Sequence, residues 1–172
     1  TAAQLGAECE RRFDACDVLL MAAAVADFRP REAAGDKLSK DAGPPELTLE
    51  ATEDVLAGLA ARRRPEQVLI GFAAEHGGDD HGPPALARAR GKLERKRLDA
   101  IVVNDISRPG IGFESSENEV TILLASGADR RLARASKARI ADGVLDEVGK
   151  LLHSKESDDR AIRADATSAA GV

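Results

Sequence analysis

The chain has 172 residues, of which 43% are hydrophobic and 32% are charged. This length and composition fit one folded domain with its own core and exclude a disordered or fibrous chain. No stretch approaches the roughly 18 consecutive apolar residues of a membrane span, and the first residues lack the pattern of a secretory leader. We therefore expect a soluble, cytoplasmic protein with no membrane partner.

The charge balance argues against nucleic acid as a partner. Thirty acidic and 25 basic residues give a net charge of -5. A nucleic-acid-binding domain usually carries a basic surface that follows the phosphates. The chain also has no Trp, no Tyr and 4 Phe, so it lacks an aromatic platform on which bases could stack.

In chain order, the first predicted element is a helix that runs from Thr1 to Cys16, opened by a capping box between Thr1 and Gln4. Cys9 and Cys16 lie about 10 Å apart along this helix, so they cannot form a disulfide with each other. We expect both to be buried as small hydrophobic residues, with no zinc site. An α/β domain that opens on a helix also suggests an N-terminal truncation.

The next elements alternate between strands and helices. Residues 17–24 (DVLLMAAA) predict a strand buried on both faces, and residues 26–45 a loop. Residues 46–51 alternate polar and apolar types, which predicts a half-exposed strand, and Thr52 is predicted to cap a helix over residues 53–64. Residues 67–74 (QVLIGFAA) predict a second buried strand, followed by an irregular segment.

The second half continues the pattern. Residues 85–98 predict a basic amphipathic helix and residues 99–103 a strand, followed by a loop over residues 104–118 that is long enough to suggest a function. Two antiparallel edge strands are predicted over residues 119–125 and 130–133. A last helix over residues 136–152 and a disordered tail over residues 153–172 complete the chain. We therefore predict an α/β, three-layer Rossmann-like or ribokinase-like fold, with a mainly parallel sheet and an antiparallel edge hairpin. Ligands of such sheets bind beyond the C-terminal ends of the strands.

Several residues at that expected rim suit a nucleotide. Asp27 could accept hydrogen bonds from a ribose and Lys37 could meet a phosphate, although an ordinary solvated loop explains both. The segment from Thr52 to Val55 offers helix amides to an anion, but Glu53 and Asp54 would repel phosphate unless a cation intervenes, and plain helix capping is the alternative.

Two further features carry the same ambiguity. Phe72 could cover a base or belong to the core. Lys92 and Lys96 share one helix face with Arg88, where they could hold a polyphosphate or form a solvated stripe. The histidines of residues 75–81 (EHGGDDH) lie in a segment without fixed geometry, so we expect no metal site there. No Gly-rich dinucleotide fingerprint, phosphate-binding loop or nucleophile elbow is present, which disfavours a dehydrogenase or a hydrolase.

Taken together, six motifs in order resemble one family, phosphopantothenoylcysteine synthetase, the ligase half of the bifunctional coenzyme A biosynthesis protein. They are AAVADFRP (23–30), KLSK (37–40), TEDVL (52–56), GFAAE (71–75), KLERKRLDAIVVND (92–105), and GF with NEVTIL (112–123). The resemblance covers about residues 1–152, which we interpret as a synthetase domain that lacks its N-terminal part.

The resemblance implies a reaction. CTP, with Mg²⁺, would activate the carboxylate of 4'-phosphopantothenate as an acyl-cytidylate, and cysteine would then displace CMP. It also implies that Lys37 is catalytic, neutralising charge as the carboxylate attacks the α-phosphorus. The implied nucleotide-binding residues are Met21, Ala22, Ala23, Asp27, Lys37, Glu53, Asp54, Val55, Leu56, Phe72, Lys92 and Lys96.

The chain departs from the family in two places. Ser39 replaces the third residue of the family's Lys-x-Lys-Lys motif, and the family's Gly-rich opening turn and Asn-containing Ser-Ser-Gly-Lys segment have no counterpart. We therefore expect nucleotide binding to be more robust than turnover. The resemblance further implies a homodimer, with a flavin decarboxylase domain fused in the full protein. The alternatives are a non-enzymatic α/β nucleotide-binding or assembly module and an oxidoreductase without the Gly fingerprint.

Overall fold

The computed structural model describes residues 1–32, 35–36, 43, 46–75, 84–106 and 115–169. Within these ranges, the helices are α1 (Ala2–Phe13), α2 (Val55–Ala61), α3 (Ala85–Arg95) and α4 (Lys137–Ala169). The strands are β1 (Val18–Met21), β2 (Phe28–Pro30), β3 (Leu49–Ala51), β4 (Val68–Glu75), β5 (Ala100–Asp105), β6 (Glu117–Leu124) and β7 (Arg130–Ser136).

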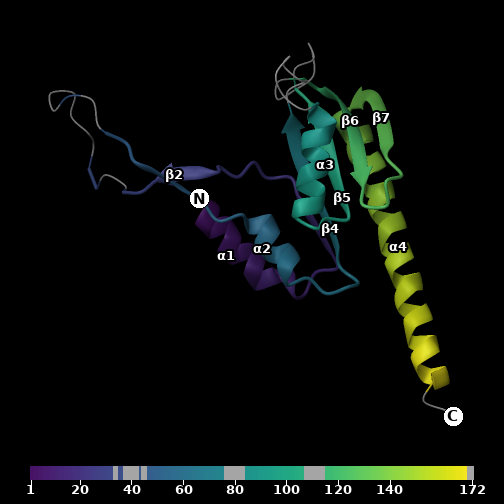
Figure 1. The fold of residues 1–172 in the computed structure, drawn as a ribbon. Coiled ribbons are helices and arrows are strands. Elements are labelled where there is room, and N and C mark those ends of the chain that lie inside the picture. The colour runs from purple at the N-terminus through teal and green to yellow at the C-terminus, as the bar shows by residue number, and fades with distance from the viewer. Residues whose placement is uncertain (33–34, 37–42, 44–45, 76–83, 107–114, 170–172) are drawn as a thin grey trace.

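The strands form a five-stranded sheet in the order β1-β4-β5-β6-β7 and a separate two-stranded pair, β2 with β3 (Figure 1). β1, β4 and β5 are parallel to one another, whereas β6 and β7 run antiparallel as a hairpin at one edge. The predicted α/β fold, with parallel central strands and an antiparallel edge hairpin, is therefore confirmed.

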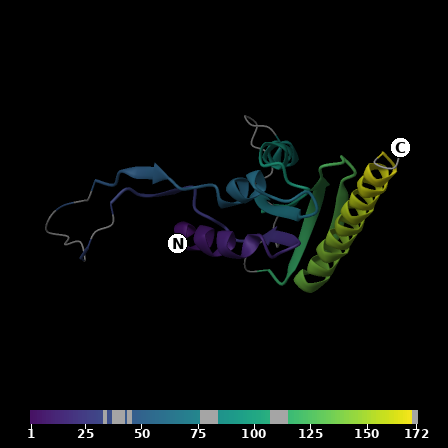
Figure 2. The same ribbon diagram turned by 90° about the horizontal axis from the view of Figure 1, so that it is seen from below.

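Helices cover the sheet on both faces, as Figure 2 shows. Alternate strand residues point to opposite sides, so the apolar strands β4 and β5 supply two cores. One core joins them to Phe13 of α1, Leu59 of α2 and Leu93 of α3. The other joins them to Val144 and Val148 of α4. The result is three layers, with α1, α2 and α3 on one side and α4 on the other.

The first strand differs from its prediction. It spans four residues instead of the predicted eight, and Leu20 is 37% exposed, whereas burial on both faces was expected. Among the described strands, β1 pairs only with β4 and so forms a sheet edge, which leaves part of its surface uncovered. After Met21 the chain leaves the sheet.

The predicted loop over residues 26–45 contains β2, which pairs antiparallel with β3. The pair extends away from the sheet as an arm (Figure 1). Phe28 and Leu49 on this arm are 62% and 56% exposed. The sequence did not indicate β2, because Pro30 and exposed residues around it are weak strand signals.

The start of α2 is also different. Asp54, not Thr52, is the N-cap, and its Oδ1 accepts a hydrogen bond from the Ala57 amide at 3.1 Å. The Thr52 hydroxyl instead donates to the Ala26 carbonyl. By contrast, the capping box predicted between Thr1 and Gln4 at the start of α1 is present.

The C-terminal helix is longer than the sequence suggested. α4 continues to Ala169, where a disordered tail was expected from residue 153. Lys155 ties this extension to the body, because its ammonium lies 3.1 Å from Asp99 Oδ1 and 2.9 Å from the Pro65 carbonyl oxygen. Cys9 and Cys16 are free thiols, partly buried where full burial was predicted. In the described ranges, no helix combines the length and apolar character that a membrane crossing requires.

Candidate functional site

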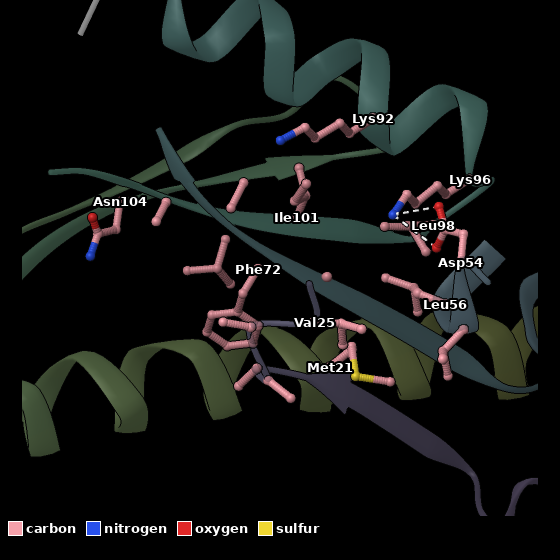
Figure 3. A pocket seen from close by; sticks show the side chains of 18 of the residues that line it. Met21, Val25, Asp54, Leu56, Phe72, Lys92, Lys96, Leu98, Ile101 and Asn104 are labelled. Atoms are coloured by element: carbon pink, nitrogen blue, oxygen red, sulfur yellow. Dashed lines mark hydrogen bonds and ion pairs between the residues drawn. The ribbon is translucent and has the colours of Figure 1, made fainter. Parts of the chain in front are cut away.

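A cavity of about 630 Å³ opens at the C-terminal ends of β1, β4 and β5 (Figure 3). Its walls come from the chain after β1, the start of α2, the end of β4, one face of α3, and short stretches of β5, β6 and α4. This is the rim at which parallel sheets bind ligands, as the sequence predicted.

Small residues form the wall next to β1. The segment from Met21 to Asp27 lines the cavity, with Ala22, Ala23 and Ala24 exposing their backbone because their side chains are short. The carbonyl oxygen of Asp27 accepts a hydrogen bond from the Thr52 amide at 2.9 Å, which joins this wall to the segment that leads into α2. A ligand can therefore approach the backbone closely here.

The end of β4 contributes residues 71–74 to the lining. Gly71 is required sterically, because a Cβ atom there would lie 2.9 Å from Leu98 Cδ1 and 3.2 Å from Leu56 Cδ2. Phe72 is 43% exposed on the cavity, which excludes its alternative interpretation as a buried core residue. An aromatic face is thus available to a planar ligand group.

Lys92 of α3 and Lys96, the C-cap residue directly after α3, line the cavity on the side of the sheet that carries α1 and α2. The Lys92 ammonium lies 2.7 Å from Glu75 Oε1, and the Lys96 ammonium lies 2.8 Å from Asp54 Oδ2. Arg88 shares the helix face, as predicted, and its Nε lies 2.9 Å from Glu75 Oε2. Lys92 and Lys96 are therefore part of the cavity lining and not only of a solvated face, whereas Arg88 contacts Glu75 beyond that lining.

The paired carboxylates are ionised in this arrangement. Burial disfavours the charge on Glu75, but hydrogen bonds from Lys92 and Arg88 outweigh it and lower the pKa of Glu75. Burial likewise opposes the charge on Asp54, while hydrogen bonds from Lys96 and the Ala57 amide lower the pKa of Asp54 overall. At neutral pH each lysine thus faces a carboxylate charge.

The sequence analysis missed the part of the lining that faces α4. Asn104, Asn118 and Ile140 lie there, and the buried Oδ1 atom of Asn104 has no hydrogen-bond partner among the described residues. Arg95 of α3 was missed as well. A polar residue that ends an apolar strand was a usable signal for Asn104, whereas the approach of β6 and α4 depends on the tertiary fold.

The structure brings eleven of the twelve predicted nucleotide-binding residues to this one cavity. They are Met21, Ala22, Ala23, Asp27, Glu53, Asp54, Val55, Leu56, Phe72, Lys92 and Lys96. The twelfth, Lys37, lies outside the described residues, as do Ser39, Lys40 and the histidines His76 and His81. Contact with a nucleotide remains a prediction for all twelve. In the described ranges, no group of three or more His, Cys, Asp or Glu side chains could hold a metal ion.

The chain is similar to curated bifunctional proteins. It is 38% identical over 148 residues to the coenzyme A biosynthesis bifunctional protein CoaBC of Bacillus subtilis, covering 86% of this chain and 34% of that protein. It is 38% identical over 154 residues to CoaBC of Mycobacterium tuberculosis, covering 86% and 36%. A cysteine/cysteine sulfinic acid decarboxylase of an unknown prokaryote is 33% identical over 153 residues, covering 89% and 41%.

Solved structures agree with this similarity. The crystal structure of the C-terminal domain of CoaBC matches with a TM-score of 0.68 and 27% identity, covering 90% of this chain and 64% of that one. A DNA/pantothenate metabolism flavoprotein from Streptococcus pneumoniae shares the fold, with a TM-score of 0.66 and 20% identity over 85% of this chain and 68% of that one.

The chain spans only 34% to 41% of the length of these curated relatives. The profile of one family, described as the DNA/pantothenate metabolism flavoprotein C-terminal domain, matches residues 1–152. This match extends from the first residue of the chain to the middle of α4 and includes every described residue of the cavity. The chain therefore belongs to the DNA/pantothenate metabolism flavoprotein C-terminal domain family.

Proposed function

We propose that this chain is the ligase part of a phosphopantothenate-cysteine ligase of coenzyme A biosynthesis, and that it uses CTP. The observation that carries the proposal is the cavity, which gathers a backbone wall, an aromatic side chain and two lysines at the C-terminal rim of the sheet. The backbone wall and the aromatic face suit a base, and the two lysines suit a triphosphate. CoaBC relatives, named for coenzyme A biosynthesis, support the substrate class.

In the proposed reaction, a carboxylate oxygen of 4'-phosphopantothenate attacks the α-phosphorus of CTP, and pyrophosphate leaves. The amine of cysteine then attacks the acyl carbon, and CMP leaves with the bonding electrons. Backbone at Met21, Ala22 and Ala23 would bind the cytosine, with Asp27 and the segment from Glu53 to Leu56 beside the nucleoside. Phe72 would line this part of the site.

The lysines are assigned by charge. Lys92 and Lys96 would hold the triphosphate, because both ammonium groups lie on the cavity side of α3. Lys37 would neutralise the charge that develops on the α-phosphate, which lowers the barrier more than it strengthens ground-state binding.

Mg²⁺ belongs to the proposal as a companion of CTP. The described residues contain no cluster that could hold a metal alone, but the cavity wall carries the carboxylates of Asp27 and Glu53. Mg²⁺ commonly takes one or two carboxylates together with substrate phosphates. Bound there, it would offset the charge of the triphosphate and of the leaving pyrophosphate.

We also propose a homodimer, located in the cytoplasm and fused to a decarboxylase domain in the full protein. The exposed apolar residues Phe28 and Leu49 on the arm support a protein contact at β2 and β3. The free thiols of Cys9 and Cys16 suit a reducing compartment. The bifunctional names of the relatives support the fusion.

Two assays separate this proposal from a non-enzymatic nucleotide-binding module. Equilibrium titration of the chain with CTP, UTP and ATP tests the base, and we expect CTP to bind most tightly. Release of pyrophosphate from CTP that depends on phosphopantothenate, measured with the full-length protein, tests the reaction. Binding without such release would favour the module, and equal affinity for the three nucleotides would contradict the assignment of CTP.

A further inference from the structure

One ion pair of the cavity occupies a lysine that the proposed function assigns to phosphate. The Lys96 ammonium lies 2.8 Å from Asp54 Oδ2 and 3.0 Å from Asp54 Oδ1, and Figure 3 shows both contacts. Lysine has three N–H donors. The ammonium therefore contacts both oxygens of one carboxylate.

The ion pair between Lys92 and Glu75 differs from this one in burial and in the number of cations around the carboxylate. The Glu75 side chain is 7% exposed and holds Arg88 as well as Lys92, so one cation stays with Glu75 if Lys92 turns to another anion. The Asp54 side chain is 48% exposed, and it accepts hydrogen bonds from Lys96 and from the Ala57 amide. Water can therefore solvate Asp54 when Lys96 leaves, whereas the buried Glu75 would depend on Arg88.

The N-cap of α2 keeps the free-energy cost low when Lys96 leaves Asp54 for a phosphate. Asp54 Oδ1 accepts from the Ala57 amide at 3.1 Å, and that bond does not require Lys96. An incoming phosphate can take the ammonium while Asp54 remains fixed at the start of α2.

We propose that Asp54 is an internal counter-ion of Lys96. The Asp54 carboxylate pairs with the phosphate-binding ammonium and competes with the phosphates of an incoming nucleotide. This inference rests on the proposed function, since it assumes that Lys96 binds phosphate. It assigns Asp54 a role in setting affinity and release, distinct from the contact with the nucleoside that the family resemblance implies.

Asp54→Asn is a suitable test, because Asn caps helices as well as Asp does but carries no charge. A partly exposed ion pair contributes up to about 1 kcal/mol, which corresponds to a gain in affinity of about threefold to fivefold when the competitor is removed. Asp54→Ser keeps a capping oxygen and serves as the second variant if Asp54→Asn does not fold. Glu94→Gln is the matched control, since it removes the same charge from an exposed position of α3 that does not line the cavity.

The measurement is isothermal titration calorimetry with CTP and, separately, with sodium tripolyphosphate, which has neither base nor ribose. We expect Asp54→Asn to tighten tripolyphosphate binding about threefold to fivefold, and Glu94→Gln to leave it nearly unchanged. In a Lys96→Ala background, Asp54→Asn should have little effect. An equal gain with and without Lys96, no gain, or no tripolyphosphate binding to any variant would overturn the inference.

The two ligands separate this inference from the proposed function. If CTP binds no better than tripolyphosphate while tripolyphosphate shows the expected dependence on Asp54 and Lys96, the assignment of CTP fails and the counter-ion role stands. If CTP binds with the expected base preference but Asp54→Asn does not tighten either ligand, the counter-ion role fails and the assignment of CTP stands.

Discussion

Gly71 provides a test of how closely the cavity and the core are packed together. Its position on β4 would bring the methyl group of Gly71→Ala to 2.9 Å from Leu98 Cδ1 and 3.2 Å from Leu56 Cδ2. Leu98 is 3% exposed and cannot turn away into solvent. Overpacking of this kind costs about 1–3 kcal/mol, so we expect Gly71→Ala to lower the free energy of unfolding by about 2 kcal/mol.

The contact with Leu98 predicts a coupling between two substitutions. Leu98→Ala alone should cost about 2–5 kcal/mol, because it leaves a cavity in the core. In the double variant the new methyl group enters that space, so the combined loss should fall short of the sum by at least about 1 kcal/mol. Urea unfolding followed by far-ultraviolet circular dichroism suits a chain without Trp or Tyr. Additive losses would refute the packing described for Gly71.

Three other predictions address catalysis, backbone strain and acid stability. Lys37→Ala in the full-length protein should abolish ligase activity and leave the CTP dissociation constant within about tenfold, since its charge is assigned to the transition state; near-normal turnover would remove Lys37 from the mechanism. Arg97 has a φ of 51°, so Arg97→Gly should raise the free energy of unfolding by about 0.5–1 kcal/mol, while Arg97→Ala, which keeps a Cβ atom, should show no such gain in the same urea experiment. Burial opposes the charge on Glu147, but hydrogen bonds from Arg130 and Lys150 lower the pKa of Glu147 below its ordinary 4.5. A lowered pKa stabilises the fold above the unfolded value and loses that contribution as the pH falls through the folded value. Glu147→Gln should therefore cost about 1–2 kcal/mol at pH 7 and less below pH 4.5, and an equal cost at both pH values would contradict the ion pairs.

Much of the sheet was predictable because its central strands are long apolar runs. Residues 67–74 and 99–103 read as buried strands, and β4 and β5 lie there. Local patterns were less informative where tertiary contacts decide the outcome. Thr52 and Asp54 are both good capping residues, and the Thr52 hydroxyl is engaged by the carbonyl of Ala26, which is distant in sequence.

The residues that line the site were predictable from the sequence, but the ion pairs among them were not. The spacing of Lys92 and Lys96 indicates a shared helix face, and the family motifs indicate which loops meet at the rim. The sequence could not show that Glu75 would be buried between Arg88 and Lys92, or that Asp54 would face Lys96 from another element. Those pairings depend on how α3 packs over β4 and α2.

The most direct test of the proposed site compares the affinities of CTP and CMP for the wild-type chain, Lys92→Ala and Lys96→Ala. Both lysines are assigned to the β- and γ-phosphates, which CMP lacks. We therefore expect each substitution to weaken CTP by about tenfold, or 1.4 kcal/mol, and CMP by less than about twofold, with a smaller loss for CTP at high salt. Equal losses for CTP and CMP, or no binding of either nucleotide to the wild-type chain, would contradict the account.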